Sequence, residues 1–362
     1  KWIQPLNKDI LDTFDPEKNK AFRFGKAARW VLLDEEGKPS GRIAAFVNSK
    51  YKNKGDTGPA GGIGFFECIN DQDCANLLFD NARHWLLKEG MQTMDGPINF
   101  GERDRFWGLV TGGFMEPLYA MNYNPPYYVT LFEEYGFKPF YHQICLSFDP
   151  KSALTQKVID KHRQLAADPD NHAEHLRKSN LEKYAKDFTT VYNAAWAGHG
   201  GLKQMTFQQV MTMFRKMKPV MDERIIWFAY HKNEPVALFV NLPDLNQWFR
   251  FLNGKFGLFQ KLKFLWLKSF RPNKKFVGLV FGVAPAWQGK GMDSFLIGES
   301  HTLFASPKMH YTEYEMQWIG DFNPKMINVA KGLGNVSESR RLTTYRYQFD
   351  RTAPFSRHPL LN

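Results

Sequence analysis

The fold is decided by residues 283–296, which read Val283-Ala-Pro-Ala-Trp-Gln-Gly-Lys-Gly-Met-Asp-Ser-Phe-Leu296. An apolar strand ends here, two glycines let the backbone turn tightly and approach a ligand, and a helix begins. The N–H groups of such a turn form an anion nest at the positive end of the helix dipole, and Lys290 adds a charge. The spacing is too short for a Walker loop. A well-capped strand-to-helix turn without a ligand has the same pattern, so the surroundings must decide.

The residues around this turn predict a mixed α/β domain in the second half of the chain. Apolar periodicity and turn residues separate the elements. In chain order we expect helices at 181–197 and 207–220, a hairpin at 225–231 and 236–241, a strand at 276–284, a helix at 293–304, a strand at 311–319, a helix at 324–331 and a strand at 342–349.

The first half repeats this order from the hairpin onward. We expect a hairpin at 28–35 and 41–48, a strand at 63–69, a helix at 71–89, a strand at 91–95, a helix ending near 137 and a strand at 141–148. A polar segment, 150–176, is predicted to connect the halves. The 362 residues suit two domains, which we place at 1–150 and 151–362.

Composition supports two packed domains. Hydrophobic residues make up 43% of the chain and aromatic residues 15%, enough for large cores. No apolar run approaches the roughly 20 residues that span a bilayer, and the first residues show no signal-peptide pattern, although the chain lacks an initiator methionine. The three cysteines lack metal-ligand spacing, so we expect no metal, no disulfide framework and a cytoplasmic protein.

A basic segment lies just before the turn. Between Asp244 and Asp293 there are nine Lys and Arg residues and no Asp or Glu, against a net charge of +11 for the chain. An anionic partner is one interpretation: a nucleotide phosphate, tRNA or an acidic membrane surface. A solvated face without a partner is the other. Residues 256–268 suit an amphipathic helix at a membrane surface, but their apolar positions spread around the helix, so we expect burial between the domains.

The turn, with the Val-Ala-Pro strand end before it, resembles the acyl-CoA motif of GNAT acetyltransferases. Residues 323–334 resemble a later segment of that superfamily, and residues 131–138 repeat it in the first half. The resemblance implies two tandem GNAT-like domains of mixed α/β fold. It implies that acetyl-CoA or another acyl-CoA lies between splayed parallel strands, 277–284 and 311–319. The cofactor-binding residues it implies are Val283, Gln288, Gly289, Lys290, Gly291, Met292, Asp293, Ser294 and Asn323.

Several residues depart from the superfamily pattern. Asp293 replaces a small residue, and we expect it to cap the helix rather than repel the pyrophosphate. The first half has no glycine turn and carries acids at the matching place, so we expect no CoA site there. The tyrosine that often serves as general acid falls at Ala330 and at Phe132, and neither side chain donates a proton.

The catalytic candidates lie on the strand beside the cofactor slot. Glu313 and Glu315 share a face, and a pair of carboxylates there would raise one pKa toward that of a general base. Pairing with the basic surface is the alternative. Tyr314, on the opposite face, is a weaker acid candidate. Asn323 has two interpretations, a hydrogen bond to pantetheine or a cap on the helix that begins at Pro324.

Two loops carry further candidates. The aromatic loop 122–128 either lines a substrate cleft or packs between the domains. His199, in a glycine-rich loop, has the chemistry of a base but no neighbouring signal.

The function predicted is a CoA-dependent N-acyltransferase acting on the amine of a small molecule or amino acid. A second hypothesis, an aminoacyl-tRNA-dependent transferase built from tandem domains of this fold, would use the basic segment. A third is a non-catalytic descendant that binds a ligand, which the missing tyrosines favour.

Overall fold

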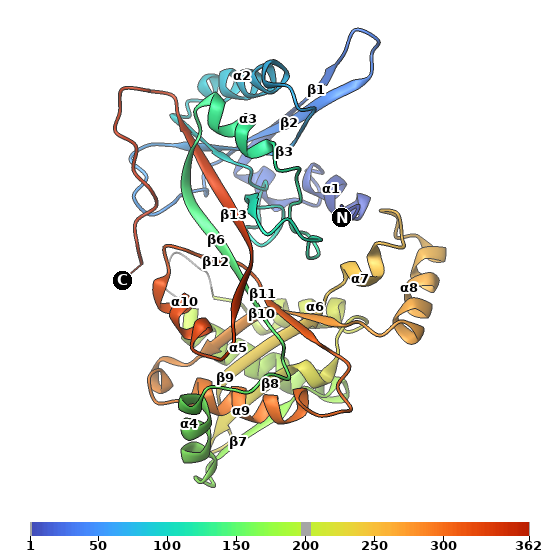
Figure 1. Cartoon of the computed structure of the whole chain (residues 1–362), viewed down its shortest axis with the longest axis vertical. Coiled ribbons are helices and arrows are strands. Elements are labelled where there is room, and N and C mark those ends of the chain that lie inside the picture. The colour runs from blue at the N-terminus through green and yellow to red at the C-terminus, as the bar shows by residue number, and fades with distance from the viewer. Residues whose placement is uncertain (1, 197–203, 362) are drawn as a thin grey trace.

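The computed structural model describes residues 2–196 and 204–361. Figure 1 shows the first half of the chain in the upper part of the molecule and most of the second half in the lower part. The elements of the first half are α1 (Asn7–Thr13), β1 (Gly25–Leu33), β2 (Pro39–Asn48), β3 (Ala60–Cys68), α2 (Gln72–Lys88), β4 (Thr93–Gly96), β5 (Leu109–Gly112), α3 (Tyr128–Tyr135) and β6 (Lys138–Phe148).

The second half repeats this plan with additions at its start and middle. Its elements are α4 (Gln156–Ala166), β7 (Asn171–His175), α5 (Leu181–Trp196), α6 (Phe207–Met217), β8 (Ile226–His231), β9 (Glu234–Pro243), α7 (Asn246–Phe249), α8 (Leu258–Phe270), β10 (Lys275–Val283), α9 (Met292–Phe304), β11 (Glu313–Met316), β12 (Ile319–Gly320), α10 (Pro324–Lys331) and β13 (Ser337–Gln348).

The segment expected to be a plain connection is structured. It contains α4, which packs along α9, and β7, which pairs with β8 at the edge of the sheet. The polar composition of the segment hid both elements, because an edge strand and a half-exposed helix need few apolar residues.

Thirteen strands of the described residues form one continuous mixed sheet. Its order is β1-β2-β3-β4-β13-β6-β11-β10-β9-β8-β7, with β5 beside β13 and β12 beside β6. The closing strands of the two halves are exchanged. The last strand of the chain, β13, pairs with β4, and β6 pairs with β11. The sheet is therefore continuous across the boundary that we expect near residue 150.

In both halves the sheet opens where a short parallel strand pair is followed by a β-bulge. The parallel pair β3–β4 runs only from Ala60 to Gly62 on β3, and the parallel pair β10–β11 only from Lys275 to Gly278 on β10. Just beyond each pair the register with the outer neighbour shifts, at a bulge that includes Phe65 in β3 and lies between Gly278 and Val280 in β10. A bulge bends its strand and increases the local twist. Each half therefore has two parallel strands that splay apart.

Residues 256–268 form most of α8, and the expected burial between the domains is wrong. Figure 1 shows α7 and α8 projecting from the side of the molecule. Only Phe264 and Leu267 of α8 are buried, in a small core with Trp248, Phe249 and Leu252, to which Leu6 also contributes. None of the described helices has the length and apolar character needed to cross a membrane.

Candidate functional site

The turn between β10 and α9 has the backbone that its glycines predict. Gly289 and Gly291 have φ angles of 73° and 94°, a region that side chains with a Cβ rarely adopt. A Cβ added to Gly289 would meet no atom of the described residues within 4 Å, so these residues leave the space above the turn open. The side-chain amide of Gln288 donates to the carbonyl of Val283 over 3.1 Å and ties the turn to the end of the strand.

The N-terminus of α9 has no side-chain cap. Gly291 is the N-cap, and no side chain within residues 2–196 and 204–361 accepts from the first N–H groups of the helix. The expectation that Asp293 caps this helix is wrong, because Asp293 is already the second residue of the first turn. The N–H groups of Met292, Asp293 and Ser294 have no intrahelical partner. The turn thus presents free donors at the positive end of a helix of 13 residues.

Two lysines lie beside the turn. Lys290 is exposed, and its Nζ lies 5.3 Å from the centre of the Trp287 ring. Trp287 in turn packs against His231, with ring centres 4.5 Å apart. From α4, the side chain of Lys161 runs past Gly291, where an added Cβ would lie 3.1 Å from its Cδ. The local charge favours an anion at the turn.

An open strand edge leads to the turn. The N–H of Gln317 donates to the carbonyl of Gly278, and the chain then leaves β10 to pair with β6 through β12. From Leu279 to Val283, β10 pairs only with β9 among the described strands. Leu279 is 37% exposed, and Trp196 packs directly over Gly282. The predicted pair of splayed parallel strands is confirmed.

Glu315 does not have the raised pKa expected of a paired carboxylate. It is fully buried, and Arg340 donates to it from Nε (2.6 Å) and Nη2 (3.1 Å). Lys275 and Ser339 complete its partners. Although burial raises the pKa of Glu315, the hydrogen bonds and charges of Arg340 and Lys275 outweigh it and hold the pKa below the ordinary value. The alternative of a strand carboxylate paired with nearby cations is the one observed.

The other two strand candidates lie in different surroundings. The Glu313 side chain is 56% exposed and pairs with Lys275 over 3.1 Å. Tyr314 is buried among Phe148, Phe239 and Phe276, and burial alone raises its pKa far above its ordinary range. Its hydroxyl therefore lies within the core rather than in solvent.

Four other predicted positions lie outside β11. Asn323 is the N-cap of α10, and its Oδ1 accepts from the N–H of Met326 over 3.2 Å, so the capping interpretation is confirmed. Ala330 and Phe132 are both buried. His199 lies outside the described residues.

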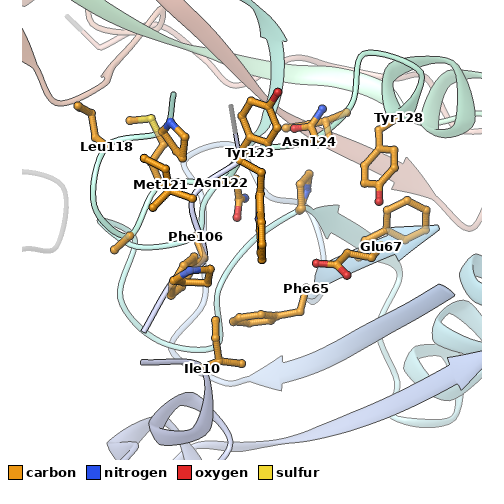
Figure 2. Close-up of a pocket in the computed structure, with 18 of the residues that line it drawn as sticks. Ile10, Phe65, Glu67, Phe106, Leu118, Met121, Asn122, Tyr123, Asn124 and Tyr128 are labelled. Carbon is orange, nitrogen blue, oxygen red and sulfur yellow. The ribbon is translucent and has the colours of Figure 1, made fainter. Parts of the chain in front are cut away.

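Sequence reasoning missed a cavity in the first half, at the splay of β3 and β4. Figure 2 shows its walls, and the aromatic loop 122–128 supplies several of them. The loop thus lines a cavity, and its role as a substrate cleft stays a prediction. Asn122 donates to the carbonyl of Gly108, and Asn124 exchanges two hydrogen bonds with Val110. At the mouth, Arg42 pairs with Glu67 over 2.9 Å. Side chains lining the cavity include Phe65, Glu67, Phe106, Met121, Tyr123 and Tyr128.

The chain has relatives of similar length. It is 24% identical to the bacterial ceramide synthase of Caulobacter vibrioides over 340 residues, which cover 92% of this chain and 87% of the relative. It is 24% identical to protein YghO of Escherichia coli over 321 residues, which cover 84% and 78%. No protein-family model matches.

Two solved structures show the same fold. One is a GCN5-related glucosamine N-acetyltransferase region in a fungal multi-domain β-N-acetylglucosaminidase, with a TM-score of 0.52 and 13% identity. It matches 95% of this chain, which spans about a third (35%) of that longer protein. The other is a tandem GNAT protein from the clavulanic acid biosynthesis pathway, with a TM-score of 0.50 and 12% identity, matched over 97% of this chain and 90% of that one. The likeness shows that the chain has the fold of tandem GNAT proteins, as the order of motifs predicted.

Proposed function

We propose that this protein is an acyl-CoA-dependent N-acyltransferase and that the second half binds the acyl-CoA. One observation carries the proposal: the open edge of β10 ends at a glycine turn whose free N–H groups lie at the uncapped start of α9. This arrangement fits a long ligand that has an amide-bearing arm and a pyrophosphate. The arm would follow residues 279–283, and the pyrophosphate would lie on Gly289, Gly291 and the first turn of α9, next to Lys161 and Lys290.

The acceptor that we propose is a primary amine on a long-chain molecule. The relative named as a bacterial ceramide synthase aligns over 92% of this chain, and ceramide formation is the acylation of such an amine. A thioester supplies an electrophilic acyl carbon. The new bond joins the amine nitrogen to that carbon, the carbon–sulfur bond breaks, and the amine proton ends on the thiolate. The chain would bind the two reactants side by side and exclude water between them.

The strand β11 supplies the groups nearest to the splay. We assign Glu315 a positioning role, because Arg340 and Lys275 hold it ionised and buried. Glu313 is the member of the predicted pair whose carboxylate solvent reaches, and it stays our candidate for accepting the amine proton. Tyr314 stays our weaker candidate for the acid. It packs against Phe148 in the core, so this role requires the core to open there during turnover.

The binding test compares two glycines with the same backbone. Gly289 and Gly90 have φ angles of 73° and 78°, and a Cβ at either one meets no atom within 4 Å. Asp at either position adds the same charge and similar strain, but only Gly289 lies at the turn. We expect Gly289→Asp to weaken CoA binding at least about tenfold in titration calorimetry, through repulsion at roughly 4–6 Å, and Gly90→Asp to bind like the parent.

The outcomes separate the three functional hypotheses. The absence of heat with the parent, or equal binding by the two Asp variants, would refute the cofactor site. Thiol release from palmitoyl-CoA that requires a long-chain amine supports the transferase. CoA binding without thiol release toward any amine supports a non-catalytic descendant. Retention of bulk tRNA that falls steeply with salt, without CoA binding, supports the aminoacyl-tRNA hypothesis, which the nine cations of residues 250–290 favour.

A further inference from the structure

The helix α8 has two apolar faces, and only one of them is covered. Phe264 and Leu267 pack into the small core with α7. At about 100° per residue, the other apolar side chains fall within an arc of about 140° on the far side of the helix. Each of them is more than half exposed, which is unusual for side chains of this size. They are Leu258, Phe259, Leu262, Leu265, Trp266 and Phe270.

Positive charges surround this exposed face. Lys255, Lys261 and Lys274 are exposed, and no salt bridge involves them within residues 2–196 and 204–361. Lys263 and Arg271 are also exposed, and the nearest acidic residues in the sequence are Asp244 and Asp293. The module that projects in Figure 1 therefore joins an aromatic surface to an uncompensated positive field.

We propose that α8 is an interfacial helix with which this protein docks on an anionic membrane. The six apolar side chains would enter the boundary between headgroups and acyl chains, and the lysines would lie at the level of the lipid phosphates. The combination of residue types on this face, with Trp266 and two phenylalanines beside lysines, is typical of such helices. The docking is independent of the acyltransfer reaction.

Charge and apolarity together select this partner. A nucleic acid would satisfy the lysines, but it would leave six apolar side chains in water. A second copy of this chain would cover the apolar side chains, but it would bring two fields of the same sign together, at a cost. An anionic bilayer satisfies both features at once.

The place of α8 in the molecule gives this docking a purpose. The core under α8 includes Leu6, and the N–H of Asn7 donates to the carbonyl of Gly254, so the N-terminal segment is attached to the α7–α8 module. Trp2 and Ile3 of the same segment, with Asn246 of α7, line the cavity of the first half. A membrane under α8 would therefore lie near a cavity whose walls include several aromatic side chains.

Vesicle binding by the full chain tests the proposal. The probes are vesicles of phosphatidylcholine alone and of phosphatidylcholine with phosphatidylglycerol, measured by co-sedimentation. We expect the parent to bind the anionic vesicles far better than the neutral ones. The triple variant Phe259→Ser, Trp266→Ser, Phe270→Ser should lose at least about tenfold in partitioning. The triple variant Lys255→Gln, Lys261→Gln, Lys274→Gln should lose about a hundredfold toward anionic vesicles.

A matched control removes exposed apolar surface elsewhere. Val31 and Leu33 of β1 are more than half exposed, and Val31→Ser with Leu33→Ser should bind vesicles like the parent. Trp266 also reports directly, because its emission, taken as the difference between the parent and Trp266→Phe, should shift to the blue on binding.

Three results would overturn the proposal. The first is that the parent fails to bind anionic vesicles, or that the aromatic variant binds them as tightly as the parent. The second is a parent dimer in sedimentation that the aromatic variant disperses, which would make a second copy the occupant. The third is retention of bulk tRNA that the lysine variant abolishes, together with indifference to vesicles.

Discussion

The helix that follows the first splayed strand in each half begins in opposite ways. In the first half, Asp71 caps α2, and its Oδ1 accepts from the N–H of Cys74 over 2.8 Å. Asp73 adds a second acid in the first turn. In the second half, Gly291 leaves the start of α9 uncapped, with Lys161 and Lys290 nearby. One fold thus uses the donors of a helix N-terminus in two ways, for its own cap or for a ligand.

The two splays differ in the same sense. In the first half, residues 113–124 fold over the splay, and Asn122 and Asn124 fasten this segment to residues 108–110, leaving a partly open cavity. In the second half, no described strand covers the edge of β10 from Leu279 up to the turn. Under the proposed function this difference is a division of work, in which the first half shapes a chamber with aromatic and polar walls and the second binds an anion.

The largest expected effect concerns the ion pairs that strand β13 makes with strands of both halves. Each of two arginines on β13 pairs with a buried carboxylate, Arg346 with Asp95 of β4 and Arg340 with Glu315 of β11. Arg346→Met or Arg340→Met leaves that carboxylate buried and poorly compensated, which costs about 3–5 kcal/mol. Denaturant unfolding of both variants should show one transition at a lower midpoint.

The control lies on the same strand. Arg341 pairs with Glu338 at the surface, so Arg341→Met should cost less than about 1 kcal/mol. If Arg346→Met instead produced two transitions, with the second half unaffected, the halves would be independent units.

A smaller effect is a dependence of stability on pH that arises in the second half, at Asp244. Asp244, beside the Glu315 pair, is buried, and desolvation raises its pKa to about 6 from an ordinary 3.8. Its contribution to stability is therefore present below about pH 4 and lost as the pH rises through about 6. Asp244→Asn keeps an acceptor for the N–H of Asn246 and removes this loss. We expect the variant to be more stable than the parent by about 1–3 kcal/mol at pH 7.

The same measurement at pH 4 is the control, because the difference should shrink there. Thermal unfolding of parent and variant across this range gives the answer, and a gap that stays constant with pH would contradict the assignment to Asp244.

The smallest effect tests the two helix starts directly. Asp71→Ala removes a cap and should lower Tm by about 1–2 °C. Asp293→Asn removes an acid that caps nothing and should leave Tm within error of the parent, while CoA binding tightens slightly because a negative charge has left the turn. Equal losses of Tm in the two variants would mean that α9 is capped after all.

The sequence predicted the order of the elements that the two halves share and the turn at Gly289 and Gly291, because glycine spacing and apolar periodicity are local signals. It did not reveal that β13 crosses to β4, since the pairing of distant strands leaves no mark on either strand alone. Likewise, the neighbours of Glu315 decide its pKa, and Arg340 lies 25 positions away in the chain.

The two errors about helices have related causes. The apolar residues of α8 suggested burial because they occur on two faces, and a sequence does not say that one of those faces stays exposed. Asp293 suggested a cap because it lies near a helix start, but the helix begins one residue earlier, at Met292.

The exchange of closing strands has a consequence for how this protein is made. During synthesis β4 emerges from the ribosome long before β13 is made. Domains generally fold as units from the N-terminus as the chain emerges. Here one edge of β4 lacks its partner in the first half until β13 emerges. Unpaired edges are templates for aggregation. Truncation before Ser337 would therefore leave that edge of β4 without its partner β13.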